Sequence, residues 1–297
     1  MGICSAADLP SEVWASGSRI TSVCLRTFAL FAAIAATQPC VVGAAWVQKR
    51  GHGILIAGLN RYFADERFSL DGAREPLGPD AEFRSWTPNV WMEVGLTNRW
   101  TGIFSFSVPT LRYEDRFYRA SATAAGDMQA GFRRALRASD SGWQVSLQAL
   151  AKAPAYSART QPRPGNGQGD LEMLLQAGRS FPVGRHWAYF SGEGGYRIRW
   201  GRPADQWRGE ASGGLHVHSR VTLMAQVFGI RSTGHFPVLP AGVNPQVEPW
   251  FHLLRVQPSV VIRLGPQLRL QGGYGWDVAG RNIGIGRQWV FAVWKTF

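Results

Sequence analysis

Beyond residue 45 the sequence lacks both cysteine and long apolar runs. All three cysteines, Cys4, Cys24 and Cys40, lie in the first 40 residues. Removal of that segment would leave a chain without thiols, which suits export to an oxidising compartment. No later stretch approaches the roughly 18 unbroken apolar residues of a membrane-spanning helix. Mean hydropathy is −0.13, so hydropathy alone would place the chain among soluble proteins.

Charged residues are also scarce, at 18% of the chain. The net charge is nevertheless +12, and the basic residues stand singly rather than in Lys/Arg runs. Nucleic-acid binding needs a clustered basic face, so we expect no nucleic-acid partner. Glycine and tryptophan are abundant instead, with 35 and 13 residues. Membrane β-barrels use glycine in turns and close strand contacts, and tryptophan at the membrane interface.

The first 45 residues predict a cleavable signal peptide. Two arginines precede the apolar run Phe28–Ala36, and the small residues Gly43–Ala45 follow it. A charged region, an apolar core and a small-residue cleavage site form the pattern of a secretory signal. We therefore expect residues 1–45 to be an N-terminal extension and signal peptide, and residues 46–297 to form one exported domain.

After this leader, polar and apolar residues alternate in segments of about 10 residues, the length of a tilted membrane-crossing strand. The clearest segment is Gln267–Asp277, in which Leu268, Leu270 and Tyr274 share one face and Arg269 lies on the other. Twelve strands are expected, at His52–Phe63, Trp86–Leu96, Thr101–Arg112, Asp127–Leu136, Trp143–Ala151, Asp170–Phe181, Trp187–Arg199, Trp207–Val217, Arg220–Gly229, Phe251–Arg263, Gln267–Asp277 and Ile283–Phe297.

The expected connections alternate in length along the chain. Outer-membrane barrels combine short periplasmic turns, longer outer loops and an even number of strands. The sequence therefore predicts an all-β fold, a single antiparallel up-and-down transmembrane β-barrel of about 12 strands. A soluble β-sandwich also shows alternation and is the rival fold. Short turns are expected at Thr97–Arg99, Arg137–Gly142, Pro182–His186, His218–Ser219 and Gly265–Pro266, and longer loops at Ala64–Ser85, Tyr113–Gly126, Pro154–Gly169, Trp200–Gln206, Ile230–Trp250 and Val278–Asn282.

The chain ends on an alternating strand in which Trp289, Phe291 and Phe297 fall on one face. A final Phe that closes such a strand resembles the signal that barrel-insertion machinery reads in outer-membrane proteins. We therefore expect the barrel-assembly machinery as a partner, through Phe297, and the Gram-negative outer membrane as the location. Its lipid and anionic lipopolysaccharide would surround the barrel, which fits dispersed basic charge.

Short motifs occur in order along the expected barrel, at Ala45–Gln48, Gly51–Gly53, Glu93–Thr97, Gly169–Glu172, Gly195–Arg197 and Ala279–Asn282. With these motifs the chain resembles a family of proteobacterial outer-membrane barrels. The family is usually described as putative transporters, related to barrel proteins found beside phenol-degradation pathways. The resemblance implies an outer-membrane location and passage of small, possibly aromatic, solutes.

The expected inward face of the barrel carries charges of both signs. Opposite charges inside a narrow barrel can pair across strands and hold its shape, or they can form a selective constriction. We predict a passive channel or transporter for small solutes. A structural or interaction barrel with a closed lumen and a lipid-modifying hydrolase remain as alternatives. The candidate lumen-lining residues are Glu93, Arg133, Glu172, Glu193, Arg197, Arg208, Glu210, Arg255 and Arg269.

Signals of catalysis and of metal binding are weak. A hydrolase site needs a His within hydrogen-bond reach of a Ser and a third group that orients the His. The least implausible His is His235, which follows Ser232 and Thr233 in a long loop. His216 and His218 form an isolated pair, which is seldom a metal site. We therefore predict no enzymatic activity, no metal and no cofactor.

Overall fold

The structure is a computed structural model that describes residues 2–3, 42–43, 45–138, 142–201, 203–234, 244–245 and 248–297. Most of the predicted signal peptide lies outside these described residues. Two short strands, β1 (Gly2–Ile3) and β2 (Val42–Gly43), pair with each other in a separate small sheet. The described part of the chain holds no helix that is long and apolar enough to cross a membrane.

The segments of alternating polarity form long antiparallel strands, because an extended chain turns successive side chains to opposite faces. A three-residue strand, β4 (Arg74–Pro76), extends one end of β3. The strands of the barrel wall are β3 (Gly53–Phe68), β5 (Glu82–Gly95), β6 (Trp100–Ser107), β7 (Thr110–Glu114), β8 (Arg119–Thr123), β9 (Asp127–Arg137), β10 (Gln144–Pro154), β11 (Asp170–Val183), β12 (His186–Arg199), β13 (Gln206–His218), β14 (Val221–Ser232), β15 (His252–Arg263), β16 (Leu268–Arg281) and β17 (Ile283–Thr296).

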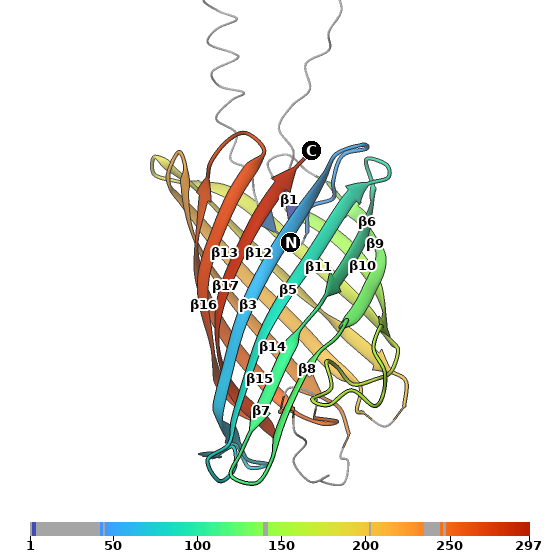
Figure 1. Ribbon diagram of the computed structural model, residues 1–297. Helices are drawn as coiled ribbons and strands as arrows, with labels where there is room; N and C mark the ends of the chain where they lie inside the picture. The colour runs from blue at the N-terminus through green and yellow to red at the C-terminus, as the bar shows by residue number, and fades with distance from the viewer. Residues whose placement is uncertain are drawn as a thin grey trace, which may run out of the picture.

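The sheet closes into a barrel because the last strand pairs with the first (Figure 1). β17 runs antiparallel to β3 from the pair Ile283 and Phe68 to the pair Thr296 and Ile54. β3 in turn pairs along its length with β5. In an open sheet, the backbone N–H and C=O groups along the outer edges of the first and last strands have no partners. Closure pairs these groups with each other, which is necessary because a membrane interior offers no water to bind them. The predicted antiparallel barrel of twelve strands is confirmed.

Two of the twelve strand positions are interrupted. β5 pairs with β6 as far as Ser107 and then with β7 from Thr110 onward. The predicted unbroken strand Thr101–Arg112 is therefore wrong at its middle, where Pro109 has no N–H to donate to a ladder. β8 and β9 share the next position, and β7 and β8 form a hairpin. The predicted loop Tyr113–Gly126 is thus partly strand.

The connections differ between the two ends of the barrel. β3 begins and β17 ends at the upper end in Figure 1, here called the terminal end, where the connections are short. The opposite end, here called the loop end, carries the connections 69–81, 155–169, 200–205 and 233–251. The predicted long loop Val278–Asn282 is wrong. β16 continues to Arg281, and Asn282 alone makes the turn with φ of 52°, a left-handed conformation that Asn tolerates.

Side chains alternate between the outside and the lumen as predicted. On β16, Leu270 and Trp276 are 38% exposed on the outer surface, whereas Arg269 is 4% exposed inside. On β13, Trp207 is exposed, and Arg208 and Glu210 line an internal cavity. This polarity is the reverse of that of a soluble β-sandwich, which buries its apolar face. The barrel therefore has an apolar outside and a polar inside.

Candidate functional site: a polar lumen

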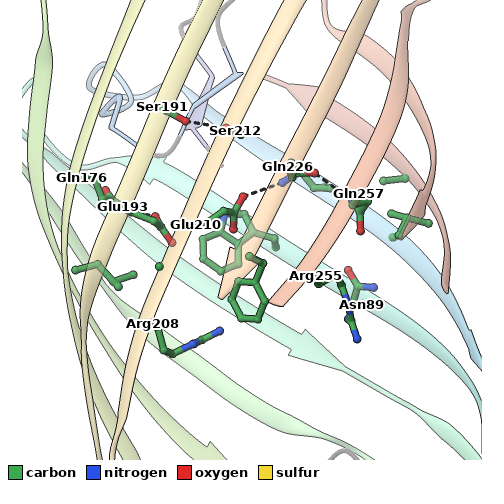
Figure 2. Close-up of a pocket in the computed structure, with 18 of the residues that line it drawn as sticks. Asn89, Gln176, Ser191, Glu193, Arg208, Glu210, Ser212, Gln226, Arg255 and Gln257 are labelled. Atoms are coloured by element: carbon green, nitrogen blue, oxygen red, sulfur yellow. Dashed lines mark hydrogen bonds between the residues drawn. The ribbon is translucent and has the colours of Figure 1, made fainter. Parts of the chain in front are cut away.

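The middle of the lumen holds a cavity of about 480 Å³. Residues from every barrel position except the one shared by β6 and β7 contribute to its wall, and the labelled side chains in Figure 2 point into it. Amides, carboxylates and guanidiniums dominate this wall because they occupy the inward positions of the alternating strands. The candidate functional site is therefore built by the whole circumference rather than by one loop.

One arc of hydrogen bonds crosses five strands of the wall, and we call it the first arc. Glu93 on β5 and Arg133 on β9 form a fully buried ion pair, with both nitrogen-to-oxygen distances at 3.0 Å. Arg133 also donates to Gln148 on β10 at 2.7 Å. Gln176 on β11 then donates to Gln148 at 3.2 Å and to Glu193 on β12 at 2.8 Å. Polar side chains at one level thus tie neighbouring strands together.

A second arc continues at the same level on the other side of the lumen. Gln226 on β14 donates to Glu210 on β13 at 2.8 Å and accepts from Gln257 on β15 at 3.1 Å. Gln288 on β17 donates to Gln257 at 2.9 Å. Figure 2 shows the links from Glu210 through Gln226 to Gln257. Arg255 joins this arc, because it donates to Gln288 while pairing with Asp277 at 2.6 Å.

The two arcs meet at a pair of like charges. Glu193 and Glu210 are direct register partners on β12 and β13. One oxygen of each accepts a hydrogen bond from a glutamine of its own arc, and no hydrogen bond joins the two carboxyls. Two carboxylates directly opposite each other on adjacent strands repel. This junction gives the cavity a locally acidic wall.

A cluster of ion pairs lies between the arcs and the loop end. Glu172 accepts from Arg197 at 2.7 Å and from Arg208 at 2.6 Å. Asp170 lies 3.0 Å from Lys152, and Lys152 lies 2.9 Å from Asp127. The pairs join β9, β10, β11, β12 and β13, so their charges are largely matched inside the wall. Arg208 also lies over the Phe228 ring, 5.0 Å from its centre.

The segment before β3 folds into the terminal end of the lumen. The Trp46 carbonyl oxygen accepts from Arg133 at 3.0 Å, and the Gln48 amide N–H donates to Thr101 at 2.8 Å. The Gln48 side chain donates to Glu93 at 3.2 Å, so this segment is attached to the first arc. Trp46 is 7% exposed and packs over Gly178, where no larger side chain would fit. Residues 45–52 therefore narrow the lumen at this end.

Apolar side chains occupy the lumen on both sides of the cavity. Toward the terminal end, Trp46 packs in one cluster with Ile54, Tyr189, Met224 and Trp294. Two further clusters lie toward the loop end, and they consist of Phe68, Phe251, Leu253, Ile283 and Ile285, and of Tyr62, Ala64, Phe83 and Leu111. The polar cavity is thus enclosed between apolar layers, and passage of a hydrated solute requires these layers to move or to leave a narrow path.

The nine candidate residues of the sequence lie on the inner side of the barrel, in several groups. Seven of them line the cavity, namely Arg133, Glu172, Glu193, Arg197, Arg208, Glu210 and Arg255. Glu93 lies behind Arg133 in the first arc. Arg269 stands apart near the terminal end and is 4% exposed, and its two terminal nitrogens have no hydrogen-bond partner among the described residues.

The candidate residues named from the sequence were all charged and left out the glutamines that connect them. Gln148, Gln176, Gln226, Gln257 and Gln288 all occupy inward positions on different strands. In the sequence, each of these glutamines is separated from an inward-facing charged residue of its strand by an even number of positions where such a residue is present, and this spacing could have identified it as inward-facing. Their common level in the barrel depends on strand register, which a sequence does not display.

The alternatives of metal binding and hydrolysis gain no support from the described residues. No group of three or more His, Cys, Asp or Glu in the described part of the chain could hold a metal ion. His235 lies outside the described residues. The Ser232 hydroxyl accepts from the Phe251 amide at 3.1 Å, and the Thr233 hydroxyl donates to the Asp205 carbonyl at 3.1 Å. Both hydroxyls therefore have structural partners.

Comparisons with known proteins agree with this architecture. No family model and no curated protein matches the sequence. Among solved structures, the chain is similar to an outer membrane channel from Pseudomonas putida F1, with a TM-score of 0.62 and 13% identity over 86% of this chain and 99% of that chain. The fold is that of an outer-membrane barrel. The similarity to a proteobacterial barrel agrees with the resemblance found in the sequence.

Two other solved barrels show weaker similarity. The translocator domain of the autotransporter NalP from Neisseria meningitidis has a TM-score of 0.46 and 13% identity, over 92% of this chain and 95% of that chain. The NanC porin has a TM-score of 0.44 and 11% identity, over 79% of this chain and 98% of that chain. At 13% identity, the similarity to the Pseudomonas putida channel shows the fold alone, and the activity has to be argued from the lumen.

Proposed function

We propose that this protein is an outer-membrane channel or transporter that passes small solutes through its lumen, without enzymatic activity. The observation that carries the proposal is the polar cavity inside a closed barrel with an apolar outside. A barrel with only a structural role gains most stability from an apolar or fully paired interior. Here a space of about 480 Å³ remains, lined by the amides and carboxylates of the two arcs.

Two belts of exposed tryptophan support the membrane location. Trp100, Trp143 and Trp187 are exposed near the terminal end. Four others, which we call the loop belt, are exposed nearer the loop end, namely Trp86, Trp207, Trp276 and Trp289. Aromatic belts mark the two headgroup regions that a membrane barrel spans. Since short turns in such barrels face the periplasm, the terminal end would be periplasmic and the loop end extracellular.

The decisive experiment is single-channel recording of the purified protein in planar bilayers. We expect discrete conductance steps in KCl, small because residues 45–52 narrow the lumen. Trp46→Ala removes the largest side chain of that segment and should raise the conductance. Trp207→Ala, which changes an outward tryptophan that is 55% exposed, is the matched control and should not.

One result would overturn the proposal. It is the absence of any conductance from wild-type protein and from Trp46→Ala, when both migrate faster unboiled than boiled on a detergent gel. The second candidate function, a structural barrel with a closed lumen, would then hold, and the apolar clusters on either side of the cavity favour it. Equal increases for Trp46→Ala and Trp207→Ala would show that the current does not pass the N-terminal segment.

A further inference from the structure

The outer surface of one side of the barrel carries several arginines near the loop end. β17, β3, β5 and β7 lie side by side there, as Figure 1 shows. Register pairing places Arg287 beside Phe63, Phe63 beside Arg84, and Arg84 beside Arg112. We call Arg84, Arg112 and Arg287 the arginine row. It crosses four adjacent strands along the hydrogen-bond direction of the sheet.

A second row of outward side chains lies next to the first, two residues closer to the terminal end along each strand. Trp289, Arg61 and Trp86 are neighbours across β17, β3 and β5. Trp86 and Trp289 are 46% and 52% exposed and belong to the loop belt. Since aromatic belts sit at the headgroup level, Arg61 lies at that level. The arginine row lies just beyond it, where the lipid phosphates of the outer leaflet are expected.

These guanidiniums are held in place while staying accessible. Arg61 lies over Trp86, 5.1 Å from the ring centre, and Arg287 lies over Phe63 at 5.0 Å. The side chains of Arg84, Arg112 and Arg287 are 52%, 48% and 46% exposed. Stacking on aromatic rings fixes the planar guanidinium and leaves its edge free for bidentate contacts.

Each arginine of the row pairs with a carboxylate one step further out. Glu82 lies 2.7 Å from Arg84, Glu114 lies 2.8 Å from Arg112, and Asp65 lies 2.6 Å from Arg287. Each carboxylate is two residues along the strand from its arginine or beside it across the sheet. Arg61 has no ion pair within the described residues, so the face of four arginines and three carboxylates keeps a positive excess.

On the far side of the barrel, β11 and β12 lack this pattern. At their loop end, Leu171 and Ile198 are register partners, and Ile198 is 45% exposed on the outer surface. Arg231 on β14 is also exposed at this end, as the register partner of Trp207 on β13. The face on β17, β3, β5 and β7 differs from these strands because its arginines and aromatic residues follow one another in consecutive register positions.

We propose that this face docks lipopolysaccharide through the phosphates of its lipid A headgroup. The proposal rests on the proposed outer-membrane function for its orientation, because only then does the loop end face the outer leaflet. Guanidiniums bind phosphate oxygens in charge-assisted bidentate pairs. Adjacent strands are ~4.8 Å apart, so Arg84 and Arg287, two strands apart, present cations about 10 Å apart. That spacing suits a headgroup with two phosphates better than one with a single phosphate.

The test is binding of diphosphoryl lipid A to the purified barrel in detergent, followed by native mass spectrometry across a lipid titration. The test variant replaces Arg61, Arg84, Arg112 and Arg287 with Gln. The matched control replaces Arg134, Arg137, Arg179 and Lys295 with Gln, which removes the same charge near the terminal end. We expect the test variant to lose about tenfold in affinity, because each exposed ion pair with a phosphate contributes only modestly, and the control to stay within about twofold.

Further arms identify the lipid and protect the result against misfolding. The four-fold Arg→Lys variant keeps the charge but loses the planar fork, so its affinity should fall between the test variant and wild type. Monophosphoryl lipid A and phosphatidylglycerol should bind wild type more weakly than diphosphoryl lipid A. Heat-dependent gel mobility and channel conductance, measured on the same samples, report on the barrel and on the proposed function separately.

Three outcomes would overturn the proposal even with an intact, conducting barrel. The test variant binds diphosphoryl lipid A as tightly as wild type does. The terminal-end control loses as much affinity as the test variant. Phosphatidylglycerol binds wild type as tightly as diphosphoryl lipid A, which would assign the face to any anionic lipid.

Discussion

Replacement of Arg133 by Met tests whether the first arc supports the barrel. Arg133 and Glu93 are both fully buried, and Arg133 makes contacts to Glu93, Gln148 and the Trp46 carbonyl. Met has a similar length but no charge, so Glu93 would keep its hydrogen bonds from Gln48 and Trp91 while losing its counter-ion. Removal of one partner of a buried pair commonly costs about 3–5 kcal/mol, because the remaining charge is left unpaired.

Urea unfolding of the barrel in lipid vesicles, followed by tryptophan fluorescence, measures this cost as a shift in midpoint at constant slope. Arg133→Met should lower the free energy of unfolding by about 3–5 kcal/mol. The double variant Glu93→Gln with Arg133→Met removes both charges and should recover most of that loss, leaving roughly 1–2 kcal/mol for the missing hydrogen bonds. Both variants should conduct more than wild type, since the Trp46 carbonyl loses its donor.

The reasoning fails if Arg133→Met unfolds within about 1 kcal/mol of wild type, or if adding Glu93→Gln recovers nothing. Either result would mean that the buried pair is solvated by water inside the lumen. Unchanged conductance together with lost stability would separate the two roles, and would show that other contacts hold residues 45–52.

Three other predictions concern the acidic junction, the strand packing and a loop-end turn. Glu210→Gln removes one of two facing carboxylates and should raise the free energy of unfolding by up to about 1 kcal/mol, with the reversal potential in a KCl gradient moving toward anion preference. Gly195→Ala would place a Cβ 1.8 Å from the Met173 carbonyl oxygen, so it should lower stability by about 1–3 kcal/mol, whereas Gly272→Ala, with no atom within 4 Å, should not. Hydrogen bonds from the Phe117 amide and the Tyr113 hydroxyl lower the pKa of the Asp115 carboxyl. These hydrogen bonds on the β7–β8 turn should therefore persist through the ordinary aspartate range and be lost only as pH falls through the lowered pKa. An Asp115 titration by NMR at the ordinary aspartate pKa would contradict this.

The barrel was largely predictable because its signal is local. Alternation along Gln267–Asp277 fixes which residues face outward, and the structure places Leu270 outside and Arg269 inside accordingly. Strand ends were less predictable. The chain keeps its pairing beyond the membrane level, so that β3 reaches Phe68 and β16 reaches Arg281, where the sequence predicted loops. Hydrogen bonding to a neighbouring strand, rather than alternation, decides those residues.

The arrangement of the lumen was less accessible than its composition. Inward charges such as Glu172 and Arg208 could be identified from parity, but their 2.6 Å contact spans three strands and depends on register and barrel tilt. The entry of Trp46 and Gln48 into the lumen left no periodic signal, because residues 45–52 precede the first long strand. Only the three-dimensional structure shows that this segment contacts Arg133.

The glutamine links carry a consequence for how the barrel could evolve. Each amide in the second arc reaches the next one because the strands between them are fixed in number, and Gln257 reaches across Gly275 of β16 to Gln288. A duplicated hairpin would insert two strands between these glutamines and separate them by more than a hydrogen-bond distance. Their donors and acceptors would then lack partners inside the lumen. The hydrogen bonds between lumen side chains therefore fix the number of strands and with it the barrel diameter. A related barrel with a different number of strands would need different lumen side chains, and not only a longer chain.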